Sequence, residues 1–310
     1  MTDPMTLLTL FTPAGVLVKP TALTLASKRL KALGFDVRID EAARARFQRF
    51  GGDDDTRLAA LHRVAAEAPS IAMATRGGYG LTRLLDRIDW TLIERSIERG
   101  TRWVGHSDLT TLQLGLLAQR KRGSGPITWA GPLAADDFGR ADDAGGVDEI
   151  TRDCFLEAMS GELEAVGFRT EPGFDGLEAR GTLWGGNLCM VNSMLGTRYF
   201  PRIKGGVLFL EDVNEHPYRV ERNLLQLLQA GVLGAQKAVL LGAFSAWSPT
   251  PLDRGYTLKS AVDHLRTRTK VPVLTGLPFG HVPVKLTLPV GARVTVAVQG
   301  RDAFVGWGHS

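Results

Sequence analysis

Short apolar runs alternate with amphipathic helical stretches along the first half of the chain. The apolar runs predict strands at 7–11, 35–39, 70–75, 103–104 and 126–130. The stretches between them predict helices at 21–33, 53–67, 90–98 and 108–119. This alternation, with short turns, predicts a parallel sheet with helices on both faces. Ligands of such sheets bind outside the carboxyl ends of the strands, so the loops after the third and fourth strands are where a site is expected.

The second half has a different, mixed pattern. It predicts helices at 149–159, 218–233 and 257–268, and an apolar helical stretch that ends near 195. Strands are predicted at 206–210, 237–241, 271–274, 285–288, 292–298 and 303–305, the last three forming an antiparallel meander. The polar, acidic stretch 134–146 predicts an exposed connection. We therefore expect an α/β chain with an amino-terminal domain at 1–140, a linker region at 141–176 and a smaller mixed α/β carboxyl-terminal domain at 177–310.

Composition narrows the functional classes. The net charge of +4 is spread along 310 residues without a dense Lys/Arg block, which disfavours nucleic-acid binding. The amino terminus lacks the basic and apolar regions of a signal peptide, and no apolar run reaches the length of a membrane-spanning helix. The two cysteines, Cys154 and Cys189, form neither a disulfide framework nor a zinc motif. We expect a cytoplasmic protein with reduced thiols and no metal.

One stretch, TRWVGHSDLTTL at 101–112, carries candidate chemistry. Ser107 lies between a strand end and a helix start, where a serine hydroxyl is presented at a sharp turn beside helix N–H groups, as in a nucleophile elbow. The alternative is an ordinary helix N-cap, a role for which serine is among the preferred residues. Leu109 stands where the G-x-S-x-G motif has its second glycine, so this stretch alone leaves both interpretations open.

The loop RGGYG at 76–80 follows the third strand. It has the spacing of neither a P-loop nor a dinucleotide site. Paired glycines also let backbone N–H groups approach a reacting carbonyl. Gly77 and Gly78 could thus form one arm of an oxyanion hole, and the N–H of Asp108 the other. A tight turn with positive φ is the alternative, and it is compatible with either use.

Two further side chains could complete a site. Glu211 follows a predicted buried strand, and it is either a catalytic carboxylate or a surface acid at a strand end. His281 lies in the turn-rich loop GLPFGH and is either a general base or a structural histidine. His106 is a rival base, but neighbours in an extended segment point to opposite faces, so it is poorly placed to reach Ser107.

The segments RGGYG, GHSDLT, LWGGNL, LFLEDVNE and GLPFGH occur in the order found in the LD-carboxypeptidase family of serine peptidases, which this sequence resembles over nearly its whole length. The resemblance implies Ser107 as nucleophile and Glu211 and His281 as its triad partners. It also implies backbone amides, here those of Gly78 and Asp108, as the oxyanion hole. For the fold it implies a flavodoxin-like amino-terminal domain that carries the serine.

The resemblance further implies a cofactor-free enzyme, commonly a homodimer, that releases D-alanine from murein tetrapeptides. Candidate substrate contacts are Gly77, Tyr79 and Arg76, with Arg102 and Lys285 as other cations that could meet the terminal carboxylate. Relatives that cleave microcin-like aminoacyl-nucleotide antibiotics are one alternative. A non-catalytic peptide- or sugar-binding protein on the same scaffold is another.

Overall fold

The computed structural model describes residues 5–119 and 125–308. Its first sheet has five parallel strands in the order β2-β1-β3-β4-β5, with β11 antiparallel to β5 at the edge. Their bounds are β1 Leu7–Phe11, β2 Asp36–Ile39, β3 Ile71–Ala74, β4 Arg102–Gly105, β5 Thr128–Ala130 and β11 Leu288–Val290. This is the flavodoxin-like order, so the predicted fold of the first half is confirmed.

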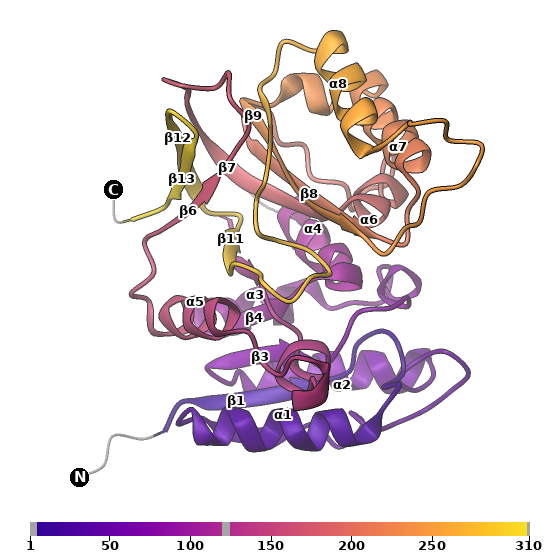
Figure 1. Ribbon diagram of the computed structural model, residues 1–310. Coiled ribbons are helices and arrows are strands. Elements are labelled where there is room, and N and C mark those ends of the chain that lie inside the picture. The colour runs from indigo at the N-terminus through magenta and orange to yellow at the C-terminus, as the bar shows by residue number, and fades with distance from the viewer. Residues whose placement is uncertain (1–4, 120–124, 309–310) are drawn as a thin grey trace.

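Helices cover both faces of the first sheet (Figure 1). They are α1 Pro20–Ala32, α2 Asp54–Glu67, α3 Trp90–Glu98, α4 Thr110–Gln119 and α5 Glu149–Ser160. Leu8 and Leu10 of β1 pack with α1 and α5, whereas Phe11 packs with α2, α3 and α4. The helix ends follow from local chemistry, since Asp53 and Asp89 cap α2 and α3 by accepting backbone N–H groups.

The second sheet has seven strands in the order β10-β9-β8-β7-β12-β13-β6. The strands are β6 Ala165–Arg169, β7 Glu178–Asn187, β8 Val207–Val213, β9 Ala238–Ser245, β10 Val273–Thr275, β12 Arg293–Gln299 and β13 Asp302–Gly306. Strands β7 to β10 are parallel, whereas β7, β12, β13 and β6 pair antiparallel. Its helices are α6 Leu188–Ser193, α7 Pro217–Gln229 and α8 Leu258–Arg268. The mixed α/β expectation for this half is therefore confirmed.

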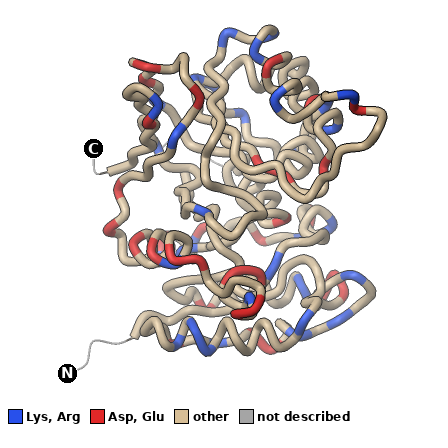
Figure 2. The backbone as a smooth tube through the Cα atoms, viewed as in Figure 1, with Lys and Arg blue, Asp and Glu red and all other residues tan. Residues whose placement is uncertain are grey.

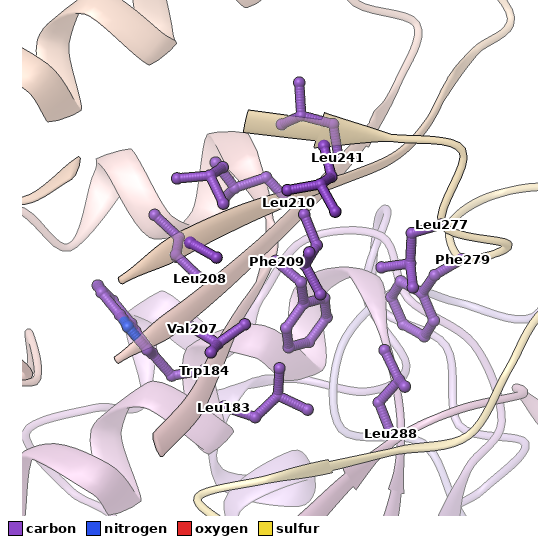
Figure 3. Packing of buried hydrophobic residues seen from close by; sticks show 14 of the residues in the cluster. Leu183, Trp184, Val207, Leu208, Phe209, Leu210, Leu241, Leu277, Phe279 and Leu288 are labelled. Atoms are coloured by element: carbon purple, nitrogen blue, oxygen red, sulfur yellow. The ribbon is translucent and has the colours of Figure 1, made fainter. Parts of the chain in front are cut away.

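The largest apolar cluster holds the second sheet against the loop that precedes β11 (Figure 3). Phe209 of β8 and Phe279 of the loop meet edge to face, with ring centroids 5.3 Å apart. Leu288 of β11 lies in the same cluster, so this core also connects the two sheets. A buried aromatic pair of this kind fixes the loop relative to β8.

The prediction that 134–146 is an exposed connection is wrong for its first part. Residues Ala134–Phe138 form a single π-helical turn, in which Ala134 and Phe138 are fully buried in the cluster with α1. The acidic composition concealed this i, i+4 apolar pair, which faces the core while Asp136 faces solvent. Only the part around the short 3₁₀ helix Asp142–Ala144 is exposed as predicted.

The carboxyl-terminal prediction also needs correction. Residues 285–287 are not a strand, and β11 leaves the expected meander to pair with β5 in the first sheet. Lys285 is instead buried in an ion pair with Asp137. Strands β6 and β7 were not predicted, and Glu211 lies inside β8 rather than after it. The division at 1–140, 141–176 and 177–310 stays a prediction.

Lys/Arg and Asp/Glu residues are both spread over the two halves of the chain (Figure 2). Within residues 5–119 and 125–308, no helix is both long and apolar enough to cross a membrane. Residues 1–4, at the start of the amino-terminal stretch without signal-peptide features, lie outside the described residues.

Candidate active site

Ser107 lies at a strained turn directly after β4. Its φ of 62° is in the left-handed region, which is unfavourable for a residue with a side chain. The 3₁₀ helix Ser107–Leu109 follows and continues into α4. Ser107 is therefore not merely the N-cap of a regular helix, because that role requires an extended backbone. The strain and the position at the carboxyl end of a central strand are the features of a nucleophile elbow.

The glycine loop after β3 packs directly on this turn. A Cβ placed on Gly77 would lie 2.4 Å from Ser107 Oγ and 3.5 Å from the backbone N of Asp108. Gly78 has a φ of 102°, as the tight-turn interpretation requires. Within the described part of the chain, the N–H groups of Gly78 and Asp108 have no hydrogen-bond acceptor. Two unpartnered N–H donors beside a hydroxyl are the components of an oxyanion hole.

The side chain of Asp108 ties the two loops together. Its Oδ2 accepts the backbone N–H of Leu81 at 2.9 Å, just after the glycine loop. Burial raises the pKa of Asp108 to about 6, against the opposing effect of this hydrogen bond. The Asp108 side chain thus positions the glycine loop, and its backbone N–H is one of the two candidate oxyanion donors.

Glu211 and His281 meet on the other half of the molecule. His281 Nδ1 lies 2.8 Å from Glu211 Oε2, and the Glu211 side chain is fully buried. The bulge between Leu210 and Asp212 locates this glutamate within β8. Glycine leaves the necessary room, because a Cβ at Gly280 would approach Glu211 Oε2 to 3.1 Å. A buried carboxylate bonded to Nδ1 fixes the ring so that Nε2 is left for other partners.

Asn187 was not predicted as a functional residue. Its Nδ2 donates to Glu211 Oε1 at 3.2 Å and to Asp212 Oδ1 at 2.9 Å, and its Oδ1 caps α6. Asn187 therefore positions the Glu211 carboxylate, which in turn positions His281. The available signal was the asparagine of LWGGNL, a capping residue at a strand–helix junction.

The electrostatic environment distinguishes the two histidines. Burial by itself lowers the pKa of His281, but the hydrogen bond and charge of Glu211 outweigh it and raise the pKa above 6.5. For His106, burial and the neighbouring His281 and Lys285 lower the pKa well below 6.5. His106 is thus neutral, and its Nδ1 donates to the Gly131 carbonyl at 2.8 Å. This supports His281 over His106 as a base.

The two halves come into contact around these residues. The ring centroids of His106 and His281 are 4.9 Å apart, and Thr110 Oγ1 accepts the backbone N–H of Asn187 at 3.1 Å. Among residues 5–119 and 125–308, Ser107 Oγ has no hydrogen bond to His281. The serine elbow and the His281–Glu211 pair are therefore adjacent but not linked. Contacts of this kind often tighten only when substrate binds.

The candidate cations lie in different places. Arg102 begins β4, at the strand end opposite Ser107. Lys285 is 2% exposed and is committed to Asp137 and to the Val282 carbonyl. Arg76 lies at the carboxyl end of β3, and its Nε is buried without a partner among the described residues. Arg76 is the candidate that this geometry supports.

Tyr79 is 39% exposed and packs against Phe50, with ring centroids 5.9 Å apart, so its ring remains accessible.

In the described part of the chain, no group of three or more His, Cys, Asp or Glu side chains is arranged to hold a metal ion. The arrangement as a whole offers a hydroxyl, two amide donors, an imidazole and a carboxylate, which are the groups needed for acyl transfer.

Comparisons with known proteins point to the same chemistry. The profile of the LD-carboxypeptidase N-terminal domain matches residues 8–124, and that of the C-terminal domain matches residues 180–296. A "probable murein peptide carboxypeptidase" of Bacillus subtilis is 29% identical, over 94% of this chain and 89% of its own.

Two solved structures resemble the fold closely. The muramoyltetrapeptide carboxypeptidase of Oxalobacter formigenes has a TM-score of 0.88 and 37% identity, over 98% of this chain and 99% of its own. A microcin C7 self-immunity protein in complex with aspartyl sulfamoyl adenosine has a TM-score of 0.82 over 97% of this chain and 95% of its own. Its 20% identity supports the fold alone. The chain belongs to the LD-carboxypeptidase family, a family of serine peptidases.

Proposed function

We propose that this protein is a serine carboxypeptidase that hydrolyses the L,D peptide bond before the terminal D-alanine of murein tetrapeptides. The observation that carries the proposal is the strained Ser107 turn beside two unpartnered amides, adjacent to a histidine bonded to a buried glutamate. The names of the B. subtilis and O. formigenes relatives support the substrate class.

In the proposed mechanism His281 Nε2 takes the proton of Ser107 as its Oγ attacks the scissile carbonyl. Glu211 accepts Nδ1–H and stabilises the imidazolium that forms. The N–H groups of Gly78 and Asp108 stabilise the tetrahedral oxyanion. His281 then protonates the leaving nitrogen of D-alanine, and water hydrolyses the acyl-enzyme by the same route.

Arg76 is proposed to receive the terminal carboxylate of the substrate. Its Nη1 donates to the Val16 carbonyl at 2.7 Å, which fixes the guanidinium beside the glycine loop. Its remaining donors then match the planar geometry of a carboxylate.

The direct test of function is incubation of the purified protein with a murein tetrapeptide. We expect release of free D-alanine and a tripeptide. A parallel incubation with aspartyl sulfamoyl adenosine addresses the immunity-peptidase alternative. Hydrolysis of that compound without release of D-alanine would contradict the proposal, and binding of the tetrapeptide without hydrolysis would favour a non-catalytic protein.

The Glu211–His281 contact predicts a specific pH dependence. His281 must be neutral to accept a proton, so kcat/KM should fall as the pH drops through a folded-state pKa above 6.5. In Glu211→Gln the charge that raises this pKa is lost while burial remains, so the acid limb should move to lower pH. The maximal kcat should also fall, by up to about 10⁴-fold as in comparable triads.

The measurement is kcat/KM from pH 5 to 8.5 for both proteins, with Glu178→Gln as control because Glu178 is an exposed acid at the start of β7. An acid limb that stays in place in Glu211→Gln would show that this carboxylate does not act on the base.

A further inference from the structure

Two cavities adjoin near the candidate site, and one of them is lined by His281. The smaller, of about 250 Å³, is lined in part by His106, His281 and Lys285. The larger, of about 590 Å³, runs along the start of α1 and past Arg76. Both are lined by Asp136 and Arg140, so the two cavities adjoin at these residues. The two cavities together, called the cleft below, extend from His281 to the exposed residues Asp136 and Asp143.

The two acidic side chains in this cleft differ in whether they are hydrogen-bonded within the protein. Asp137 accepts hydrogen bonds from Lys285 Nζ, from Arg140 at 3.2 Å and from the backbone N–H of Leu133 at 2.8 Å. Its neighbour Asp136 has no hydrogen bond or ion pair with any residue within 5–119 and 125–308. The Asp136 carboxylate is therefore available to a ligand, whereas the Asp137 carboxylate is already bonded to groups of the protein.

The surroundings of Asp136 also affect the ionisation of its carboxyl group. Solvent reaches it through the cleft, but the surrounding protein is dense enough that burial raises the pKa of its carboxyl group, with Arg76 as the strongest opposing influence. The Arg76 guanidinium in turn lies against the glycine loop, with Cζ 4.0 Å from the Cβ position of Gly78. The unpaired carboxylate of Asp136 and the guanidinium of Arg76, whose buried Nε has no partner among the described residues, thus line the same cavity, and Asp136 also lines the one that contains His281.

Murein peptides carry an amine on the side chain of the diamino acid that supplies the scissile carbonyl. We propose that Asp136 is a specificity residue that binds this side-chain ammonium, next to the carboxylate site at Arg76. The inference rests on the proposed function and adds a contact that selects the residue before the cleaved bond. Partially desolvated charge pairs of this type are worth about 10- to 100-fold in binding or rate.

The test compares two tetrapeptides that differ only in the third residue, L-lysine or Nε-acetyl-L-lysine. The wild-type protein should cleave the lysine peptide with a kcat/KM about 10- to 100-fold higher. In Asp136→Asn this preference should disappear through loss on the lysine peptide, with little change on the acetylated one. Asp143→Asn is the matched control and should keep the preference, because Asp143 is an exposed acid that lines the larger cavity but not the one with His281.

Each outcome decides a different point. Unchanged activity of Asp136→Asn on the acetylated peptide shows that the variant is folded and active, so a lost preference is a specificity effect. An equal rate on both peptides in the wild type, or a preference that survives in Asp136→Asn, would overturn the inference alone. Acetylation of the peptide's amino terminus, with the lysine side chain left free, is a further comparison. If this change lowers kcat/KM in the wild type but not in Asp136→Asn, Asp136 binds the terminal amine, and the inference is overturned. Failure to cleave either peptide would contradict the proposed function instead.

Discussion

Replacing Ser107 by alanine should lower kcat by about 10³-fold or more, because it removes the proposed nucleophile; in well-studied triads the loss reaches about 10⁶-fold. Ser107→Gly should be equally inactive but more stable than Ser107→Ala. The φ of 62° at this position costs a residue with a Cβ about 1 kcal/mol that glycine does not incur. The pair of variants therefore separates the chemistry of the hydroxyl from the strain of the turn.

The measurements are D-alanine release and thermal unfolding of the wild type and both variants. Retention of full turnover by either variant would exclude Ser107 as the nucleophile. Equal stability of the two variants would instead show that the turn relaxes when the hydroxyl is removed.

Gly77→Ala should be the second large effect. The added Cβ would lie 2.5 Å from the Cβ of Ser107, and no rotation of the serine hydroxyl can relieve that overlap. Either the glycine loop or the serine turn must shift, which would displace the amide donors relative to the reacting carbonyl. Loss of one such donor costs about 10²–10³-fold in kcat, and we expect a loss of that size here.

Gly234→Ala is the matched control, since a Cβ there meets nothing within 4 Å. Both variants should remain folded by circular dichroism, and only Gly77→Ala should lose kcat. A Gly77→Ala protein with normal kcat would show that this loop is not part of the catalytic arrangement.

The parallel sheet of the first half was predictable because each of its elements is marked by local chemistry. Apolar runs define β1 and β3, and aspartates cap α2 and α3. What the sequence did not reveal depends on contacts distant along the chain. β11 pairs with β5 across about 160 residues of sequence, and Phe138 is buried because both α1 and Phe155 of α5 pack against it. β7 was missed because the glycines at its end suggest a turn, although one of them makes room for Thr110.

The candidate site was predictable to a similar extent. Strand ends, turn formers and the order of five segments together indicate Ser107, Glu211 and His281. The structure brings Glu211 and His281 into contact. The contacts of Asn187 and the role proposed for Asp136 could not be derived from the sequence, because each depends on which neighbouring side chains are already paired. Composition shows that an acid is present. Only the three-dimensional contacts show that Asp137 is hydrogen-bonded to Arg140 and Lys285 and that Asp136 has no such partner among the described residues.

The central claim is that Ser107 becomes acylated during turnover. It is tested most directly with a depsipeptide in which D-lactate replaces the terminal D-alanine, since an ester leaving group makes acylation faster than hydrolysis of the acyl-enzyme. Rapid quenching followed by mass spectrometry should show the protein carrying the tripeptide acyl group, mapped to Ser107, together with a burst of D-lactate. Release of D-lactate with the acyl group on another residue, or with no covalent species at any quench time, would contradict the account.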